Sequence, residues 1–402
     1  MTNRQMLYSL IFSFLVLIAC EDEPRRGVDP DDKEEEVTVD KFYFGADLSY
    51  VNQILDHGGV YKEAADEKSP YEIFADHGTN LARFRLWHNP VWTKEVYENG
   101  TQLYNDLYDV EKSIRLAKAE GMDVLLDFHY SDDWADPAKQ HVPGAWVNIT
   151  DIEVLADSIY NYTFSVLSYL DDKGLMPEMV QIGNETNCGM MLSGGNDAFP
   201  EMNVCESGWS NMGIVVKAAI KAVKAAAENS TVDTKIAFHV ADPVNVEWWF
   251  DKLMEQTTDF DFVGISYYPL WHTGVSFNQL EDRIKGFKER FNKEIIILET
   301  AYPWTTNGAD DYNNLFGGES PISGYPYTLE GQTSFLVELT QKLVDAGASG
   351  VVYWEPAWIS SQMKDQWGTG SSWENNTFFD FEGNVMTNID FMTYDYSSDE
   401  KN

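Results

Sequence analysis

Two short stretches decide the fold, Gln181-Ile182-Gly183-Asn184-Glu185 and, much further along the chain, Ile296-Ile297-Leu298-Glu299-Thr300. Each is an apolar run closed by one glutamate, which predicts a buried parallel strand whose last side chain is reactive. A carboxylate at the end of an apolar strand is costly to bury unless it has a partner or a function. The alternative for each glutamate is that it caps a helix or pairs with an arginine.

Strand-like and helix-like patterns alternate eight times along most of the chain, which favours a parallel α/β fold. The expected strands are short apolar runs at Phe42–Asp47, Leu81–Leu86, Val124–Phe128, Met179–Ile182, Ile236–Val240, Phe262–Ser266, Ile295–Leu298 and Val351–Trp354. The clearest helical periodicity covers Val110–Ala119, Ile152–Leu170, Met212–Ala227, Phe277–Phe291 and Thr333–Asp345. Gly121, Gly174 and Gly347 follow three of these stretches, where a helix C-terminus favours glycine.

Eight such repeats predict a single α/β domain, a (β/α)8 TIM barrel with enlarged βα loops. We expect this domain to span residues 41–395, with residues 396–402 as a C-terminal tail. The stretch Asn307–Tyr327 is rich in Gly, Asn, Asp, Ser and Pro and predicts a long loop after the seventh strand.

The first 20 residues have the features of an export signal. Arg4 is followed by the apolar run Leu7–Ile18, and Leu17-Ile18-Ala19-Cys20 resembles a bacterial lipobox, which predicts a lipoprotein signal peptide with lipid on Cys20. The alternative is a plain signal peptide in which Cys20 occurs by chance. Residues 21–40 are acidic and poor in apolar side chains, as in a flexible tether. We therefore expect a protein of the cell envelope that is lipid-anchored to the outer membrane and exposed at the cell surface. We also expect it to be a monomer.

The charge of the chain restricts its partners. A net charge of −38 argues against nucleic acid, which needs clustered Lys and Arg, and against a strongly anionic polymer. A neutral substrate is therefore expected. Cys188 and Cys205 lie in one expected loop and either form a disulfide or remain two separate thiols; they lack the spacing of a zinc site.

In a barrel of this kind the active site lies at the C-terminal ends of the strands. Polar and aromatic residues gather there in this sequence, and 13 Trp and 21 Tyr supply many flat faces on which sugars stack. Two strand-end glutamates from distant strands are typical of glycoside hydrolysis, which uses one carboxylic acid and one carboxylate. We therefore expect Glu185 and Glu299 to be the catalytic residues.

Taken together, the strand-end motifs resemble those of glycoside hydrolase family 53, the endo-β-1,4-galactanases. Three motifs come from the first half of the barrel: Gly45-Ala46-Asp47-Leu48-Ser49, Arg83-Phe84-Arg85-Leu86-Trp87-His88-Asn89-Pro90 and Asp127-Phe128-His129-Tyr130-Ser131-Asp132-Asp133-Trp134-Ala135-Asp136-Pro137. The other four are Gln181-Ile182-Gly183-Asn184-Glu185, Gly264-Ile265-Ser266-Tyr267-Tyr268-Pro269, Glu299-Thr300-Ala301-Tyr302-Pro303-Trp304 and Tyr353-Trp354-Glu355-Pro356-Ala357-Trp358. Seven motifs in the same order make the resemblance specific.

The resemblance implies a retaining enzyme that cleaves β-1,4-galactan, a neutral side chain of pectin, with Glu185 as acid/base and Glu299 as nucleophile. From the residue types we expect Arg85 to keep Glu299 ionised and Tyr267 to donate a hydrogen bond to it. Asn184 is expected to bind the sugar 2-hydroxyl. No cofactor is required for this chemistry.

Eleven residues at the expected strand ends are candidates for substrate contact: Asp47, Arg85, Trp87, His129, Trp134, Asn184, His239, Tyr267, Trp304, Trp354 and Trp358. Some relatives hold Ca²⁺ in the loop after the seventh strand. Gly308 stands here in place of one acidic ligand, and Asp310, Asn314 and Glu374 remain as oxygen ligands for a structural Ca²⁺.

Three other functions fit parts of the sequence. A metal-dependent barrel hydrolase would use His129, Asp132, His239 and Asp242, although the His-x-x-Asp spacing is loose. A non-catalytic glycan-binding lipoprotein would use the same aromatic residues and the same anchor. A related barrel glycosidase would act on another neutral β-glycan.

Overall fold

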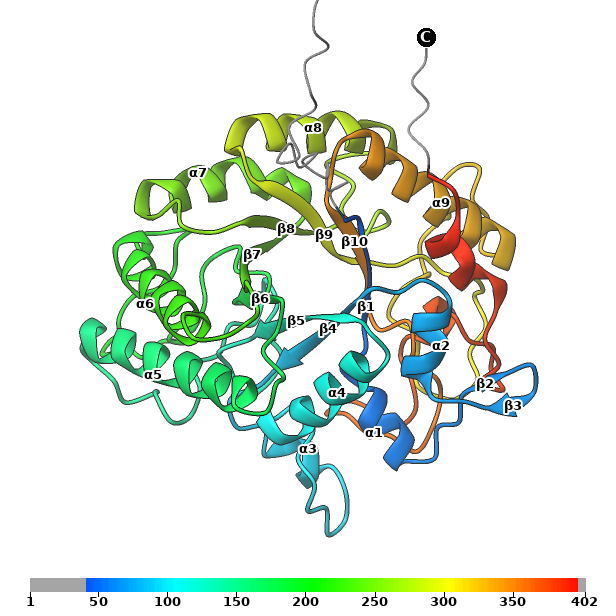
Figure 1. The fold of residues 1–402 in the computed structure, drawn as a ribbon, viewed down its shortest axis with the longest axis horizontal. Helices are drawn as coiled ribbons and strands as arrows, with labels where there is room; N and C mark the ends of the chain where they lie inside the picture. The colour runs from blue at the N-terminus through cyan, green and yellow to red at the C-terminus, as the bar shows by residue number, and fades with distance from the viewer. Residues whose placement is uncertain (1–40, 397–402) are drawn as a thin grey trace, which may run out of the picture. The chain divides into compact units, whose positions relative to one another are not determined.

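The computed structural model describes residues 41–396, which form a closed barrel of parallel strands surrounded by helices (Figure 1). The predicted signal peptide, Cys20, the acidic tether and residues 397–402 lie outside the described residues. Within the described range, no helix is long and apolar enough to cross a bilayer. Tyr396, expected in the C-terminal tail, stacks on Phe44 at 5.8 Å between ring centroids, so the packed domain includes it.

Eight of the ten strands in the described residues close the barrel in the order β1-β10-β9-β8-β7-β6-β5-β4. They are β1 (Tyr43–Asp47), β4 (Leu81–Leu86), β5 (Asp123–Phe128), β6 (Met179–Ile182), β7 (Lys235–Ala241), β8 (Phe262–Ser266), β9 (Glu294–Thr300) and β10 (Gly350–Tyr353). The predicted barrel is confirmed, and each predicted strand coincides with one of these within two residues. The short hairpin of β2 (Lys62–Glu63) and β3 (Asp66–Glu67) was not predicted.

Helices connect the barrel strands and cover the outside. They are α1 (Val51–Asp56), α2 (Pro70–Asp76), α3 (Trp92–Glu95), α4 (Leu107–Ala119), α5 (Ile152–Asp171), α6 (Trp209–Ala227), α7 (Val246–Gln256), α8 (Leu280–Phe291) and α9 (Leu329–Asp345). Short 3-10 helices are η1 (Pro243–Asn245), η2 (Phe277–Gln279), η3 (Glu374–Asn376) and η4 (Thr387–Thr393). The predicted helix at Phe277–Phe291 is therefore two elements, η2 and α8. Helix α9 begins four residues before the predicted start because Thr328 caps its first turn, accepting a hydrogen bond from the Gly331 N–H.

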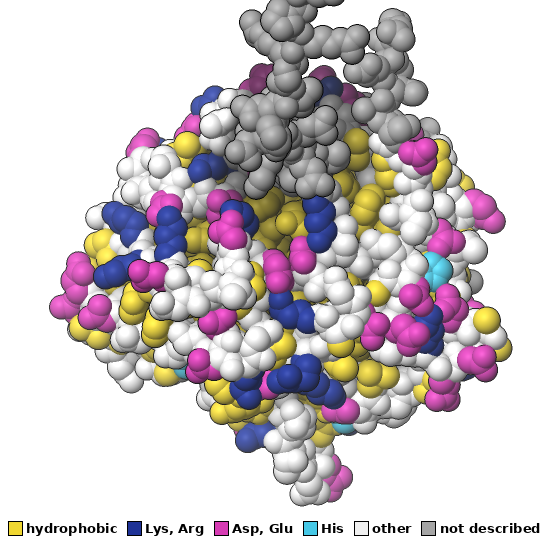
Figure 2. Space-filling model, in the orientation of Figure 1, with side chains coloured by type: hydrophobic (Ala, Val, Ile, Leu, Met, Phe, Trp, Pro, Cys, Tyr) yellow, Lys and Arg dark blue, Asp and Glu magenta, His cyan; other side chains and the backbone are white. Residues whose placement is uncertain are grey.

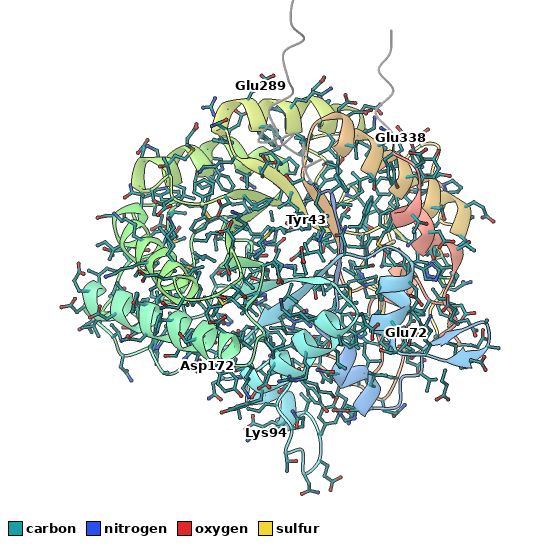
Figure 3. All side chains as sticks on the ribbon, viewed as in Figure 1. Tyr43, Glu72, Lys94, Asp172, Glu289 and Glu338 are labelled. Atoms are coloured by element: carbon teal, nitrogen blue, oxygen red, sulfur yellow. A yellow bond between two sulfur atoms is a disulfide. The ribbon has the colours of Figure 1, made fainter. Side chains whose placement is uncertain are left out.

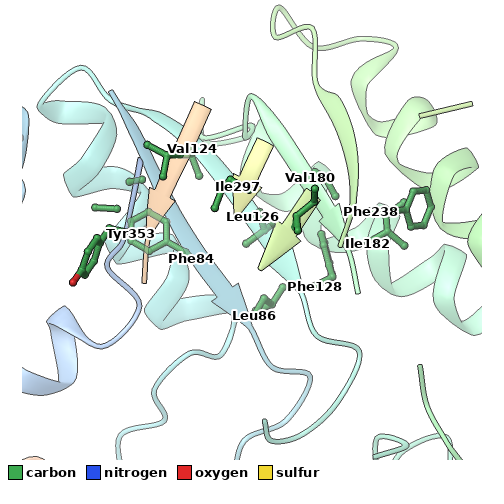
Figure 4. Packing of buried hydrophobic residues seen from close by; sticks show 14 of the residues in the cluster. Phe84, Leu86, Val124, Leu126, Phe128, Val180, Ile182, Phe238, Ile297 and Tyr353 are labelled. Carbon is green, nitrogen blue, oxygen red and sulfur yellow. The ribbon is translucent and has the colours of Figure 1, made fainter. Parts of the chain in front are cut away.

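Alternation along each strand separates two apolar layers. Side chains on the outer face of the barrel, among them Phe84, Leu86, Leu126 and Phe128, pack against the helices (Figure 4). The inner face forms a separate apolar cluster made of Leu81, Leu125, Met179, Ala237, Phe262, Ile296, Leu298 and Val352. This cluster fills the barrel from the N-terminal ends of the strands, so the inner side chains that follow it along each strand lie near the opposite mouth.

Charged side chains cover the outside of the domain. Figure 3 shows Asp172, Glu289 and Glu338 at its periphery, whereas Tyr43 lies near the centre. On the face drawn in Figure 2, acidic and basic side chains are interspersed. The excess of acidic residues is therefore not gathered into one continuous patch on that face.

Candidate active site

Polar side chains follow the apolar cluster along the inner face of the barrel. On β4 the inward positions read Leu81, Arg83 and Arg85, and on β5 Leu125 is followed by Asp127. Arg83 and Arg85 are each 1% exposed, and Asp127 is fully buried. Ionised groups at this depth require partners, and the structure supplies them from neighbouring strands.

Glu299 faces the site because β9 contains an irregularity. Ile265 of β8 pairs with Ile297, but the next residue, Ser266, pairs with Glu299, so β9 has one extra residue at this point. Leu298 packs inside the barrel, and regular alternation would turn Glu299 outward. The bulge turns it inward instead, as bulges near active sites often do. Gly264 on β8 leaves room for Leu298, the residue before Glu299, because a Cβ at position 264 would lie 2.3 Å from a methyl group of Leu298.

Glu185 is placed by a sharp turn after β6. Gly183 has φ of +79° and Glu185 has φ of +45°, a left-handed conformation that is costly for a residue with a side chain. The Gly183 N–H donates to the carbonyl of Phe128, and the Glu185 N–H donates to Nδ1 of His239 at 3.3 Å. Strained backbone of this kind is commonly held at functional sites.

The two glutamates face each other across the barrel mouth. One carboxylate oxygen of Glu185, one of Glu299 and a ring nitrogen of His239 all lie within 4.8 Å of one another. Burial and the nearby charge of Glu299 raise the pKa of Glu185 well above its usual value. Burial also raises the pKa of Glu299 to about 7, but Arg83 and a hydrogen bond from Tyr268 oppose this increase. The pair therefore holds its proton on Glu185 and its negative charge on Glu299.

Arg83, rather than the predicted Arg85, neutralises Glu299. Nη1 of Arg83 lies 2.9 Å from Oε1 of Glu299 and 2.8 Å from Oδ2 of Asp47, and Nη2 donates to Asp127 and Asn184 at 2.7 Å each. Arg85 pairs with Glu355 instead. Both arginines lie on the inner face of β4, two residues apart, so the sequence did not distinguish them.

Tyr268, rather than the predicted Tyr267, donates a hydrogen bond to Glu299. The Tyr268 hydroxyl donates to Oε2 of Glu299 at 2.9 Å, whereas the Tyr267 hydroxyl donates to the carbonyl of Val275 at 3.3 Å. Both tyrosines follow β8, where the strand has ended and alternation no longer fixes the direction of a side chain. Burial and Glu299 raise the pKa of Tyr268, so its hydroxyl stays protonated.

Glu185 and Glu299 line a cleft of about 650 Å³. Seven of the predicted substrate contacts line it: Asp47, Arg85, His129, Trp134, Asn184, Trp354 and Trp358. Four predicted contacts do not line it: Trp87, His239, Tyr267 and Trp304. The first three are fully buried, and Trp304 packs on Phe381 and donates its indole N–H to the carbonyl of Glu374. For these four positions, a strand-end location indicated proximity to the mouth but not exposure in it.

Buried His239 is held in the neutral state. Burial and then Arg83 lower its pKa well below the usual value. Its ring contacts Asn184, Gln181 and the Ser266 hydroxyl at 2.9–3.0 Å. It therefore orients the residues around Glu185 and has no surface exposed in the cleft.

Several cleft residues were not predicted because they lie in long loops without periodicity. Trp271, Trp367, Trp373 and Tyr312 line the cleft, and Trp271 and Trp367 are 44% and 57% exposed. Exposed tryptophans beside a catalytic cleft are suited to stacking on sugar rings. In the sequence, only the large number of Trp and Tyr residues indicated that further aromatic side chains could line the site.

The predicted calcium ligands Asp310, Asn314 and Glu374 all have atoms beside Gly308, and carboxylate and amide oxygens are the ligand type that Ca²⁺ prefers. Oδ1 of Asn314 and Oε2 of Glu374 are buried oxygens without a hydrogen-bond partner in the described part of the chain. Burial and the neighbouring Asp310 raise the pKa of Glu374 to about 7, against the opposing hydrogen bond from the Ala309 N–H. A Cβ at Gly308 would lie 2.8 Å from Glu374, so this glycine faces the same site without supplying an oxygen ligand from a side chain.

The remaining predictions about cysteines and metals are also decided by geometry. Cys188 and Cys205 form a disulfide, which settles the alternatives left open by the sequence. His129, Asp132, His239 and Asp242 do not form a metal-binding group. Among residues 41–396, Glu185, His239 and Glu299 are the only group of three His, Cys, Asp or Glu side chains whose ligand atoms lie close together. The metal-dependent hydrolase is therefore not supported by this arrangement.

Comparison with known proteins gives the same family. The model of glycosyl hydrolase family 53 matches residues 43–392. An arabinogalactan endo-β-1,4-galactanase from Cellvibrio japonicus is 39% identical, covering 89% of this chain and 92% of that protein. Arabinogalactan endo-β-1,4-galactanase A from Emericella nidulans is 31% identical over 86% of this chain and 92% of its own length. The solved Ignisphaera aggregans GH53 catalytic domain has a TM-score of 0.76 at 32% identity, covering 89% of this chain and 97% of that one. The chain therefore belongs to glycosyl hydrolase family 53 and is a glycosidase.

Proposed function

We propose that this protein is a retaining endo-β-1,4-galactanase that cleaves galactan and the galactan side chains of type I arabinogalactan. The main support for a retaining mechanism is the short distance between Glu185 and Glu299, whose carboxylate oxygens approach within 4.8 Å. Retaining glycosidases hold their two carboxyl groups about 5–5.5 Å apart, whereas inverting enzymes need about 6.5–9.5 Å to admit a water molecule between them. The family and the names of the relatives support galactan as the substrate.

In the first step, ionised Glu299 attacks the anomeric carbon while Glu185 donates its proton to the departing glycosidic oxygen. This forms a covalent glycosyl-enzyme and removes the charge from Glu299. The pKa of Glu185 then falls, because Glu299 no longer raises it, and Glu185 becomes the base that deprotonates water. The water attacks the same carbon and releases Glu299, so two inversions give net retention. Arg83 and the Tyr268 hydroxyl stabilise Glu299 as an anion before attack and as a leaving group afterwards.

The lining of the cleft suits a neutral chain that is cut internally. Trp134, Trp354 and Trp358 provide apolar faces near the catalytic pair, and Trp271 and Trp367 provide exposed faces. Stacking on aromatic rings binds neutral sugars without charge matching. The net charge of −38 disfavours a polygalacturonate backbone, most strongly at low salt.

Two measurements on the same digests test this proposal. The viscosity of a β-1,4-galactan solution should fall well before reducing ends accumulate, and β-1,3-galactan, β-mannan and polygalacturonate should remain intact. Early release of galactose at unchanged viscosity would show an exo-acting enzyme. Preferred cleavage of β-mannan would assign the protein to another neutral β-glycan.

We further propose that Asp310, Asn314 and Glu374 hold a structural Ca²⁺, which plays no part in the chemistry. The two buried oxygens without a partner support this proposal. Calcium should raise the melting temperature and EDTA should lower it, and Glu374→Gln should abolish the difference. A melting temperature that does not respond to Ca²⁺ or EDTA would exclude the site.

Finally, we propose that lipid on Cys20 anchors the protein to the outer membrane. The lipobox-like Leu17-Ile18-Ala19-Cys20 and the acidic stretch after it support this proposal. Cys20→Ala should release or mislocalise the protein while the catalytic domain keeps its activity. Unchanged membrane association of that variant would exclude lipid anchoring.

A further inference from the structure

A third glutamate lies at the barrel mouth, and the mechanism does not use it. Glu355 comes two residues after β10, has no exposed surface and does not line the cleft. Its backbone φ is +46°, nearly the same left-handed value as that of Glu185. A buried carboxylate on strained backbone is costly on both counts, so its presence calls for a function.

The partner of Glu355 is Arg85. Nη1 of Arg85 lies 2.6 Å from Oε1 of Glu355, whereas its distance to Oδ1 of Asp47 is 4.0 Å. Nε and Nη2 of Arg85 are buried and have no hydrogen-bond partner among the described residues. Glu355 is thus paired with a different arginine from the one that neutralises Glu299, and Asp47 lies beside both arginines.

Aromatic rings surround the Arg85 guanidinium. Its Cζ atom lies 4.1 Å from the ring centroid of Tyr50, 4.4 Å from that of Trp134 and 5.2 Å from that of Trp87. Desolvated contacts between a cation and an aromatic face are among the stronger ones of this type. The planar guanidinium is therefore held in place by Glu355 at one nitrogen and by the indole and phenol rings around it.

Trp134 connects this arrangement to the substrate. It lines the cleft, and its ring centroid lies 6.0 Å from that of Trp354, the tryptophan directly before Glu355. Its indole nitrogen has no hydrogen-bond partner among residues 41–396, so no hydrogen bond within this range fixes the orientation of the ring. Packing against Arg85, Tyr50 and Trp87 must do so.

We propose that Glu355 and Arg85 are positioning residues that hold Trp134 in the orientation needed to bind the sugar chain, and so set substrate affinity without taking part in bond cleavage. This inference rests on the proposed galactanase function. A buried ion pair is poor evidence for stability in itself, because apolar residues of similar volume often serve equally well. The Glu355–Arg85 pair is therefore better explained by its role in orienting Trp134 than by stability.

The test compares Glu355→Gln and Arg85→Lys with the wild type on linear β-1,4-galacto-oligosaccharides of defined length. Gln keeps the shape of Glu355 but removes the counter-charge, and Lys keeps the charge of Arg85 but removes the plane that stacks on Trp134. We expect both variants to raise KM about tenfold while kcat stays within about twofold. Matched controls are Glu247→Gln and Arg290→Lys, whose ion pairs with Arg283 and Asp251 lie on the outer surface.

The outcomes separate the possible roles. A lower melting temperature with unchanged KM would show that the pair is only structural, and a collapse of kcat at unchanged KM would show that it acts in the chemistry; either result overturns the inference. Activity of the wild type on galactan is measured in the same series, and its absence would overturn the proposed function instead.

A double-mutant cycle gives an independent readout if Glu355→Gln does not fold. Trp134→Phe should raise KM by itself, and Arg85→Lys should add little in the Trp134→Phe background because the platform it positions is already lost. Fully additive effects on KM would show that Arg85 does not act through Trp134 and would overturn the inference.

Discussion

Replacement of Tyr268 by Phe removes one hydrogen bond from the nucleophile and changes little else. The Tyr268 hydroxyl donates to Oε2 of Glu299 at 2.9 Å and favours the ionised carboxylate. The side chain is 5% exposed and already lies among aromatic rings, so Phe fits the same space. The variant therefore isolates the contribution of a single donor.

The magnitude follows from the charge of the acceptor. A hydrogen bond to an ionised group contributes about 1.5–3 kcal/mol, and about 1.4 kcal/mol corresponds to one pKa unit. Loss of the donor should raise the pKa of Glu299 from about 7 by about one to two units. Attack requires ionised Glu299, so activity is lost as the pH falls through this pKa. The acidic limb of the profile should therefore move to higher pH, with at least about tenfold lower kcat/KM on the acid side.

The assay is the pH dependence of kcat/KM on a soluble galacto-oligosaccharide, whose two limbs report apparent pKa values of the catalytic pair. Tyr267→Phe is the matched control, because the Tyr267 hydroxyl donates to the carbonyl of Val275 and does not contact either glutamate. A shifted acidic limb in Tyr267→Phe and an unshifted one in Tyr268→Phe would refute the assignment.

Further predictions concern the catalytic pair and the disulfide. Glu185→Ala and Glu299→Ala should each lose most hydrolysis of galactan and keep the fold; with an activated leaving group, azide should give a β-linked product in the first variant and an α-linked product in the second. Near wild-type rates in either variant would remove that residue from the mechanism. Cys188→Ser should lower the free energy of unfolding by about 3 kcal/mol, because the disulfide closes a loop between residues 17 positions apart; equal urea midpoints for variant and wild type would contradict this stabilising role.

The strand positions, and the placement of Glu185 and Glu299 at strand ends, were predictable because both follow from local patterns. Buried parallel strands are apolar runs, and Leu81–Leu86, Met179–Ile182 and Phe262–Ser266 were predicted with their observed bounds. Glu185 and Glu299 were recognisable because a lone acidic residue ends such a run. The helix starts were less visible, since capping residues such as Thr328 precede the apolar periodicity.

The direction of side chains at the strand ends was not predictable. An extra residue in β9 turns Glu299 inward, and no local pattern indicates that bulge. Arg83 and Arg85 share one face of β4, and only the positions of Glu299 and Glu355 across the barrel decide which arginine serves which carboxylate. Trp271 and Trp367 enter the cleft from irregular loops, whose course depends on tertiary contacts.

The configuration of the first product tests the central claim most directly. Proton NMR spectra of linear β-1,4-galacto-oligosaccharides, recorded within the first minutes of hydrolysis, distinguish the anomer that the enzyme releases from the anomer that mutarotation forms later. If Glu299 attacks carbon and Glu185 activates water, as their separation of less than 4.8 Å implies, the β-anomer should appear first. Initial release of the α-anomer would show a single displacement by water and would contradict the assignment of Glu299 as the nucleophile.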